Sequence, residues 1–191
     1  MRNKSILVAI AILMMSGCAL PRTFGPYSGK VVDAENNEPI EEAVVAVWYY
    51  TKSSSMGGTV GRFADAIETT TNANGEFSIP THSVYLFKIL EWWDDKNSVS
   101  IFKPGYAAYP GNFKAYSSLK KEQSYSIPEN EYIMVYLPKL MTVKERKDNL
   151  YDIEIPGGVD ILNDEIPNLR RLESEERFNV GLQPYKEWRK E

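Results

Sequence analysis

The chain has 191 residues, of which 43% are hydrophobic, 12% aromatic and 25% charged. This length supports one domain with a core plus an appendage, and the composition is that of a folded rather than a disordered protein. The formal net charge of -4, with no basic stripe, argues against binding to nucleic acid, because such proteins need an excess of Lys and Arg to displace counterions from phosphates.

The first 17 residues are typical of a bacterial export signal. Arg2 and Lys4 form a positive start, and an unbroken apolar run follows at residues 6–15. That run is about half of the roughly 20 residues that a membrane-spanning helix needs. It ends in Met-Ser-Gly-Cys at residues 15–18, which resembles a bacterial lipobox with Met15 in place of the more usual Leu. We therefore expect residues 1–17 to be a lipoprotein signal peptide, whose removal with Arg2 and Lys4 takes the formal charge from -4 to -6.

Cys18 is the single cysteine of the chain, so an internal disulfide is excluded. The lipobox resemblance implies that Cys18 is acylated on its sulfur and becomes the new amino terminus, which is acylated in turn. The alternative is an ordinary signal peptide with a buried free Cys. Ala19, where an Asp would retain the protein at the inner membrane, implies the outer membrane of a Gram-negative cell. Residues 18–26 are the expected lipidated tether, which would keep the domain within about 30 Å of the lipid.

Residues 27–138 carry the patterns of a β-sandwich. Tyr27–Asp33 is the first predicted strand, and the polar cluster at residues 34–38 predicts a turn. Residues 40–50 are apolar on both faces, as in a strand well inside a sandwich. The last clear strand is Tyr132–Leu137, in which Ile133, Val135 and Leu137 share one face.

Two further segments suggest turns and loops. Residues 69–80 combine threonines with Asn72, Asn74 and Gly75, which predicts a β-hairpin. Residues 53–61 are rich in Ser and Gly but lack the Gly-Lys-Ser/Thr ending of a phosphate-binding loop, so we expect a mobile loop between strands there.

Five short motifs recur in a familiar order. They are Gly-Lys-Val-Val-Asp at residues 29–33, Pro-Ile and Ala-Val-Val at 39–45, Thr through Asn-Gly-Glu-Phe at 71–77, Lys-Pro-Gly-Tyr at 103–106, and Tyr-Leu at 136–137. In this order the chain resembles carboxypeptidase regulatory-like domains over residues 27–138. The resemblance implies a mainly β fold, a seven-stranded Greek-key transthyretin-like sandwich without an active site, in a supporting or binding role. Glu42, where a Gly is common, and the long insertion at residues 51–66 depart from the family pattern.

Trp92 and Trp93 stand between carboxylates in Glu-Trp-Trp-Asp-Asp at residues 91–95. On a strand, one ring would point inward and the other outward. Both rings are candidates for stacking on a sugar or for anchoring a protein partner, and the alternative is that one ring packs in the core while the other is partly exposed. The spacing of the carboxylates lacks a calcium-loop pattern.

A second set of aromatic residues crowds the Gly/Pro-rich segment 105–118. Tyr106, Tyr109 and Tyr116 are the candidate binding residues there, with Phe113 beside them. The alternative is a long loop held to the sandwich by its own rings.

Catalytic and metal-binding signals are weak throughout. His82 is the single histidine, without Cys or other His partners for a metal and without a Ser motif for a hydrolytic triad. We therefore predict no catalytic residue, no metal site and no cofactor.

Residues 139–191 form the expected charged helical tail. Thr-Val-Lys-Glu at residues 142–145 has the form of a capping box that opens a helix toward Asn149. A second helix, capped by Asn163 or Asp164 with Pro167 in its first turn, would carry Ile166, Leu169 and Leu172 on one apolar stripe. The tail could dock on the sandwich or on a partner.

The function expected from the sequence is that of a non-catalytic, lipid-anchored envelope protein with a protein partner at the membrane. The alternative is a carbohydrate-binding module that uses exposed aromatic rings.

Overall fold

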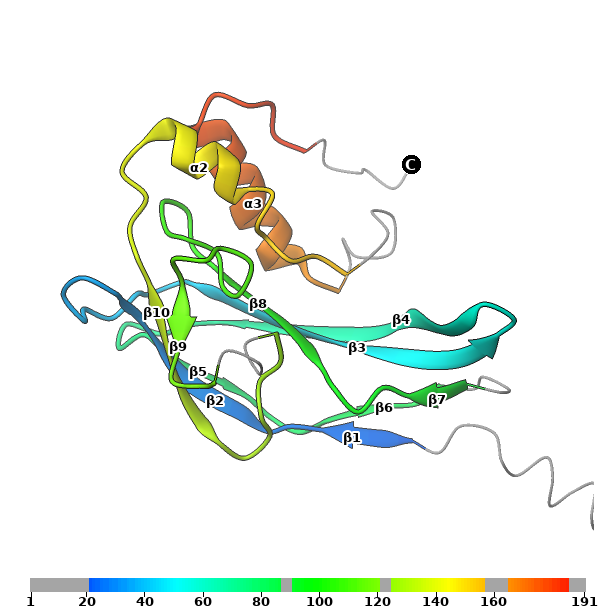
Figure 1. The fold of residues 1–191 in the computed structure, drawn as a ribbon. Helices are drawn as coiled ribbons and strands as arrows, with labels where there is room; N and C mark the ends of the chain where they lie inside the picture. Colours follow the sequence, from blue (N-terminus) through cyan, green and yellow to red (C-terminus); the bar gives the residue numbers. More distant parts are fainter. Residues whose placement is uncertain (1–20, 87–90, 121–124, 157–164, 186–191) are drawn as a thin grey trace, which may run out of the picture.

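The computed structural model describes residues 21–86, 91–120, 125–156 and 165–185. The expected signal peptide and Cys18 lie outside the described residues. The fold is mainly β with two helices near the C-terminus, as predicted (Figure 1). The strands of the first half are β1 (Arg22–Phe24), β2 (Tyr27–Asp33), β3 (Val44–Ser55), β4 (Gly58–Thr70), β5 (Glu76–Ile79) and β6 (His82–Val84). The later elements are β7 (Glu91–Trp93), β8 (Ser98–Phe102), β9 (Tyr116–Ser117), β10 (Tyr132–Leu137), α2 (Val143–Asn149) and α3 (Pro167–Asn179).

One layer of the sandwich is the sheet β5-β2-β10-β9. Its two longest strands, β2 and β10, are neighbours and run parallel, with Ser28 opposite Tyr132 and Asp33 opposite Leu137. The short pair β1-β6 extends this layer, since β1 leads into β2 and β6 follows β5. Both strands predicted here, Tyr27–Asp33 and Tyr132–Leu137, are confirmed with their bounds.

The other layer is built around β3, which pairs with β4 on one side and with β8 and then β7 on the other. If β1 is joined with β2, β5 with β6 and β7 with β8, the described strands form a seven-stranded Greek-key sandwich. Segments adjacent in sequence, such as β4 and β5, lie in different sheets.

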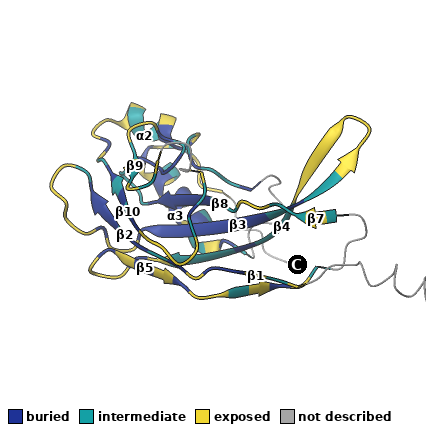
Figure 2. Ribbon diagram, turned by 60° about the horizontal axis from the view of Figure 1, so that its bottom comes forward, coloured by how far each residue is buried: buried dark blue, intermediate teal, exposed yellow. Residues whose placement is uncertain are grey.

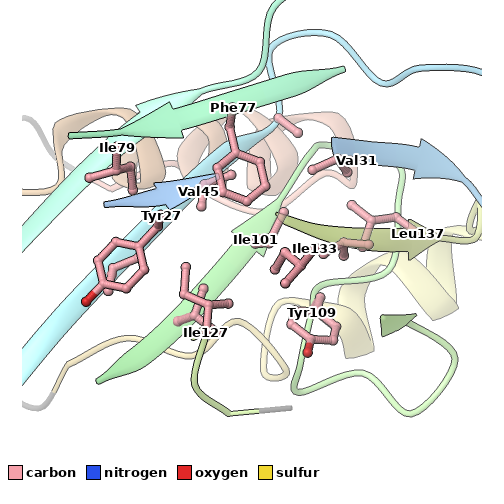
Figure 3. Close-up of a cluster of buried hydrophobic side chains, with 14 of the residues drawn as sticks. Tyr27, Val31, Val45, Phe77, Ile79, Ile101, Tyr109, Ile127, Ile133 and Leu137 are labelled. Atoms are coloured by element: carbon pink, nitrogen blue, oxygen red, sulfur yellow. The ribbon is translucent and has the colours of Figure 1, made fainter. Parts of the chain in front are cut away.

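The main core lies between the two layers (Figure 3). Alternate residues of β3 face it, including Val45 and Val47, and they meet Val31 from β2 and Ile133 and Val135 from β10. All five side chains are buried. The face of the last strand that Ile133, Val135 and Leu137 were predicted to share is the one that meets the core, because the alternation of a strand places every second side chain on the same side.

A second core covers the outer face of β3. Val44, Ala46 and Trp48 pack there against Leu169 and Leu172 of α3. This is why the run in β3 is apolar on both faces: the helical tail, and not only the opposite sheet, buries it. The tail therefore docks on the sandwich, as Figure 1 shows.

The first tail helix begins as predicted. Thr142 caps α2 and forms a capping box with Glu145, and the helix ends at Asn149. The second differs from prediction: the N-cap of α3 is Ile166, which has no side-chain cap, while Asn163 and Asp164 lie outside the described residues. Its first N–H groups instead donate to Glu68 of β4, from Asn168 at 2.6 Å and Leu169 at 3.0 Å.

Three local expectations need correction. Residues 22–24, predicted as tether, form β1, because pairing with β6 satisfies their backbone groups. Residues 53–61, predicted as a mobile loop, belong to the long β3–β4 hairpin, which turns at residues 56–57. Residues 69–80 contain the predicted turn but no hairpin, because β4 pairs with β3 while β5 pairs with β2 across the sandwich.

Candidate functional site

Trp92 and Trp93 lie on opposite faces of β7, as the alternation of a strand predicts. Trp93 is opposite Thr51 on the core side, and its ring meets the edge of Phe24 at a centroid distance of 5.2 Å. Trp92 is opposite Lys52 on the outer side and is 47% exposed. Of the two predicted binding candidates, Trp92 presents its ring at the surface, while Trp93 packs against the core.

A charged pair lies beside Trp92. Lys52 Nζ is 2.8 Å from Asp94 Oδ1, and the Asp94 backbone N–H donates to the Tyr50 carbonyl at 2.9 Å. Partial burial raises the pKa of Asp94, but the hydrogen bonds from Lys52 and from the Lys96 backbone outweigh it and hold that pKa below its ordinary value. Asp94 is therefore ionised at neutral pH and offers carboxylate oxygens next to the exposed indole.

A shallow hollow of about 240 Å³ adjoins this pair. Its lining is aromatic and polar: Tyr50, Asp94, Lys96, Asn97, Ser98, Tyr125 and Ser126. Pockets for drug-sized ligands span about 300–1,000 Å³, so this one fits a single ring or side chain. The Asn97 side chain already has partners within the protein: its amide N–H donates to the Ile127 carbonyl at 2.8 Å, and its Oδ1 accepts from the Ile127 N–H at 2.9 Å.

We call Trp92, Lys52, Asp94 and this hollow the Trp92 surface. It offers a flat ring for stacking, the ammonium groups of Lys52 and Lys96, the Asp94 carboxylate and the phenol of Tyr125, which is 58% exposed. Such a combination suits a sugar ring or an aromatic anchor of a protein partner.

The second predicted cluster does not form one binding loop. Tyr109 is 1% exposed and belongs to the main core (Figure 3), so it is unavailable to a ligand. Tyr106 is half-buried, with its hydroxyl 3.4 Å from Asp33 Oδ2 and Lys139 over its ring. Tyr116 alone of these three is exposed, and its ring stacks on Tyr136 at 4.8 Å. The loop is held to the sandwich by Tyr106 and Tyr109.

His82 joins the two sheets rather than facing a nucleophile. Its Nε2 lies 2.6 Å from Asp65 Oδ2 on β4, and its ring stacks near Tyr49. Among the described residues no group of three or more His, Cys, Asp or Glu side chains could hold a metal ion. In the same part of the chain, no helix is long and apolar enough to cross a membrane.

Reasoning from the sequence missed the neighbours of Trp92. Tyr50 ends the predicted strand at residues 40–50, Lys52 falls in the insertion at residues 51–66, and Tyr125 has no predicted role. The alternation of β3 puts Tyr50 and Lys52 on the same face as Trp48, a signal that was present in the sequence. Their meeting with Trp92 depends on strand register, which the sequence does not state.

Comparisons of this chain with protein-family models, curated proteins and solved structures find no match. The resemblance to carboxypeptidase regulatory-like domains therefore depends on the motifs within the chain.

Proposed function

We propose that this chain is a non-catalytic, lipid-anchored protein of the cell envelope, in which a carboxypeptidase regulatory-like sandwich presents the Trp92 surface to a protein partner close to the membrane. The lipobox at residues 15–18 supports acylation of Cys18, and Ala19 supports the outer membrane. The parallel pairing of β2 with β10 and the Greek-key order agree with the proposed family.

One contact carries the proposal. Arg22, the first residue of β1, donates from Nη1 to the Asp94 carbonyl oxygen at 2.9 Å. Only four peptide bonds separate Arg22 from Cys18, a span of at most about 14 Å. The Trp92 surface is thus bonded to the start of the sandwich next to the proposed anchor, where a membrane-associated partner would be met.

Site-specific crosslinking in cells tests this function. A photoreactive phenylalanine analogue at position 92 should yield a discrete adduct in the acylated protein, and the adduct should disappear with Cys18→Ser, which we expect to release the protein from the membrane. The same analogue at Tyr151, which is 91% exposed on the tail, is the matched control. Equal adducts at both positions, or palmitate labelling that survives Cys18→Ser, would contradict the proposal.

The second candidate function is carbohydrate binding. The exposed Trp92 ring beside a hollow lined by hydroxyl and carboxylate groups favours it. A glycan array probed with the protein should then show a ligand whose affinity falls about tenfold or more with Trp92→Ala, since loss of one stacking contact removes on the order of 1.4 kcal/mol. Tyr116→Ala should leave that affinity unchanged. An array without any bound glycan would rule against this second function.

A further inference from the structure

The β3–β4 hairpin projects past the rest of the sandwich at the end of the molecule where β1 begins (Figures 1 and 2). Pairing between its strands continues to Ser55 and Gly58, whereas β7 accompanies β3 only as far as Ser53. Among the described residues the last rungs are therefore two-stranded, and residues 54–62 are exposed. Met56 at the turn is fully exposed, and Val60 is 44% exposed.

The tip of this hairpin, residues 53–61, contains no charged side chain. A basic residue flanks the tip on each side. Lys52 is paired with Asp94 at 2.8 Å, and Arg62 is paired with Glu91 at 3.1 Å. The chain as a whole is acidic, but its tip carries no carboxylate that anionic lipid headgroups would repel. An uncharged segment with an exposed Met is suited to the boundary between headgroups and acyl chains.

The lengths of two chain segments show that the hairpin tip and the proposed anchor, Cys18, can reach the same surface. The Arg22 side chain contacts Asp94, and Asp94 pairs with Tyr50 of β3. From Tyr50 the strand runs six residues to Met56, or about 20 Å at the rise of a β-strand. Cys18 lies at most about 14 Å from Arg22 along the backbone. A lipid surface that holds Cys18 is therefore within reach of the hairpin tip.

We infer that residues 54–60 rest in the interfacial layer of the phospholipid surface to which Cys18 is anchored, with Met56 entering the apolar boundary. This inference depends on the proposed acylation of Cys18. The tip supplies too little apolar area to bind a membrane alone, but the anchor raises its local concentration at the surface. Two points of attachment then orient the sandwich and hold the Trp92 surface to one side of the hairpin.

Nitroxide labelling tests the contact, because an introduced cysteine is the sole free thiol once Cys18 is acylated. The variant Met56→Cys is labelled in the acylated full chain and reconstituted into vesicles of phosphatidylethanolamine and phosphatidylglycerol. The matched control is Met141→Cys, 80% exposed and located beyond the far end of β10. The collision rates of each label with oxygen and with a water-soluble nickel complex report its depth. Mass spectrometry of the N-terminal peptide first establishes acylation.

The label at position 56 should show a several-fold lower nickel collision rate than the label at 141, together with a higher oxygen collision rate. In a Cys18→Ser background the two labels should be equally accessible to nickel. If the acylated protein binds vesicles but its label at 56 is as accessible as that at 141, the inference is overturned and the proposed function stands. If Cys18 is not acylated, the proposed anchor fails, and the inference fails with it.

Discussion

Gly111 marks a point where two backbone segments touch. A Cβ atom added there would clash with the backbone carbonyl oxygen of Asp152, in the segment after α2. Nearby, Asn112 donates to both Asn149 and Asp152 at 2.9 Å. The residue at 111 thus controls how closely the loop before β9 meets the tail.

We predict that Gly111→Ala lowers the free energy of unfolding by about 1–3 kcal/mol, because a backbone oxygen must move to admit the methyl group. Urea denaturation followed by circular dichroism measures this loss. Gly57→Ala at the hairpin turn is the control, since a Cβ there meets no atom within 4 Å. Equal stability of both variants would contradict the close contact.

Asp33 makes the stability of the fold depend on pH. It is 1% exposed at the end of β2, accepts from the Glu35 N–H at 2.8 Å and lies 3.1 Å from Lys139 Nζ. Burial raises the pKa of this carboxyl, but these hydrogen bonds outweigh it and hold the pKa below its ordinary value of 3.8.

A carboxyl whose pKa is lower in the folded than in the unfolded protein stabilises the fold at pH values above its unfolded-state pKa. This stabilisation is lost as the pH falls through the pKa of the folded state. We therefore expect Asp33→Asn to lower the unfolding free energy by about 1–3 kcal/mol at pH 7 and by progressively less below about pH 3.8. Urea titrations at several pH values measure the difference. The exposed Glu41→Gln is the control, and a difference between Asp33→Asn and wild type that is constant with pH would refute the role of this carboxylate.

At the scale of elements, a buried ion pair joins α2 to α3. Arg146 Nε and Nη2 donate to the two carboxylate oxygens of Glu176, at 2.8 and 2.5 Å, and the Glu176 side chain is fully buried. Arg171 and Glu175, both on α3, form an exposed ion pair at 4.0 Å. The two pairs have similar chemistry but very different solvent access.

We predict that Arg146→Met destabilises the protein by about 3 kcal/mol, because it leaves a buried carboxylate without its cation. Arg171→Met should change the free energy of unfolding by no more than about 0.5 kcal/mol. Thermal and urea unfolding compare the two variants. A similar loss of unfolding free energy in both variants would show that the buried ion pair does not stabilise the packing of α2 against α3.

At the scale of the whole molecule, the tail completes the sandwich. Its removal would uncover the outer face of β3 and β8, which presents Val44, Ala46, Trp48 and Phe102, each at most 2% exposed. Figure 2 shows these two strands as buried along most of their length. A contiguous apolar patch of this kind promotes association between molecules.

A chain that ends at Pro138 should therefore aggregate and bind the dye ANS, as measured by sedimentation and fluorescence. The same truncation with Trp48→Thr and Phe102→Thr is the control; it should bind several-fold less dye, because the patch is interrupted. A truncated chain that stays monomeric without dye binding would show that the tail is dispensable for the fold.

Much of the fold was predictable from local patterns. Alternation put Ile133, Val135 and Leu137 on a common face of the last strand, and the capping box at Thr142 located α2, because each signal depends on residues near one another in sequence. The opposite orientations of Trp92 and Trp93 follow from the same alternation. These features require no knowledge of partners elsewhere in the chain.

The tertiary structure decided which surfaces remain open. Glu68 caps α3 from a strand about 100 residues away, and Glu173 and Glu176, which look solvent-facing in the sequence, are buried and each form an ion pair with an arginine. Tyr109, a predicted binding residue, lies in the core, while Trp92 lies beside Lys52 and Asp94. Burial depends on what a face packs against, and strand register brings together residues whose separation in the chain carries no signal. The sequence by itself therefore determined the mainly β fold and strands such as β2 and β10, because their patterns are local, and only the folded chain defined β1, the Trp92 surface and the projecting hairpin.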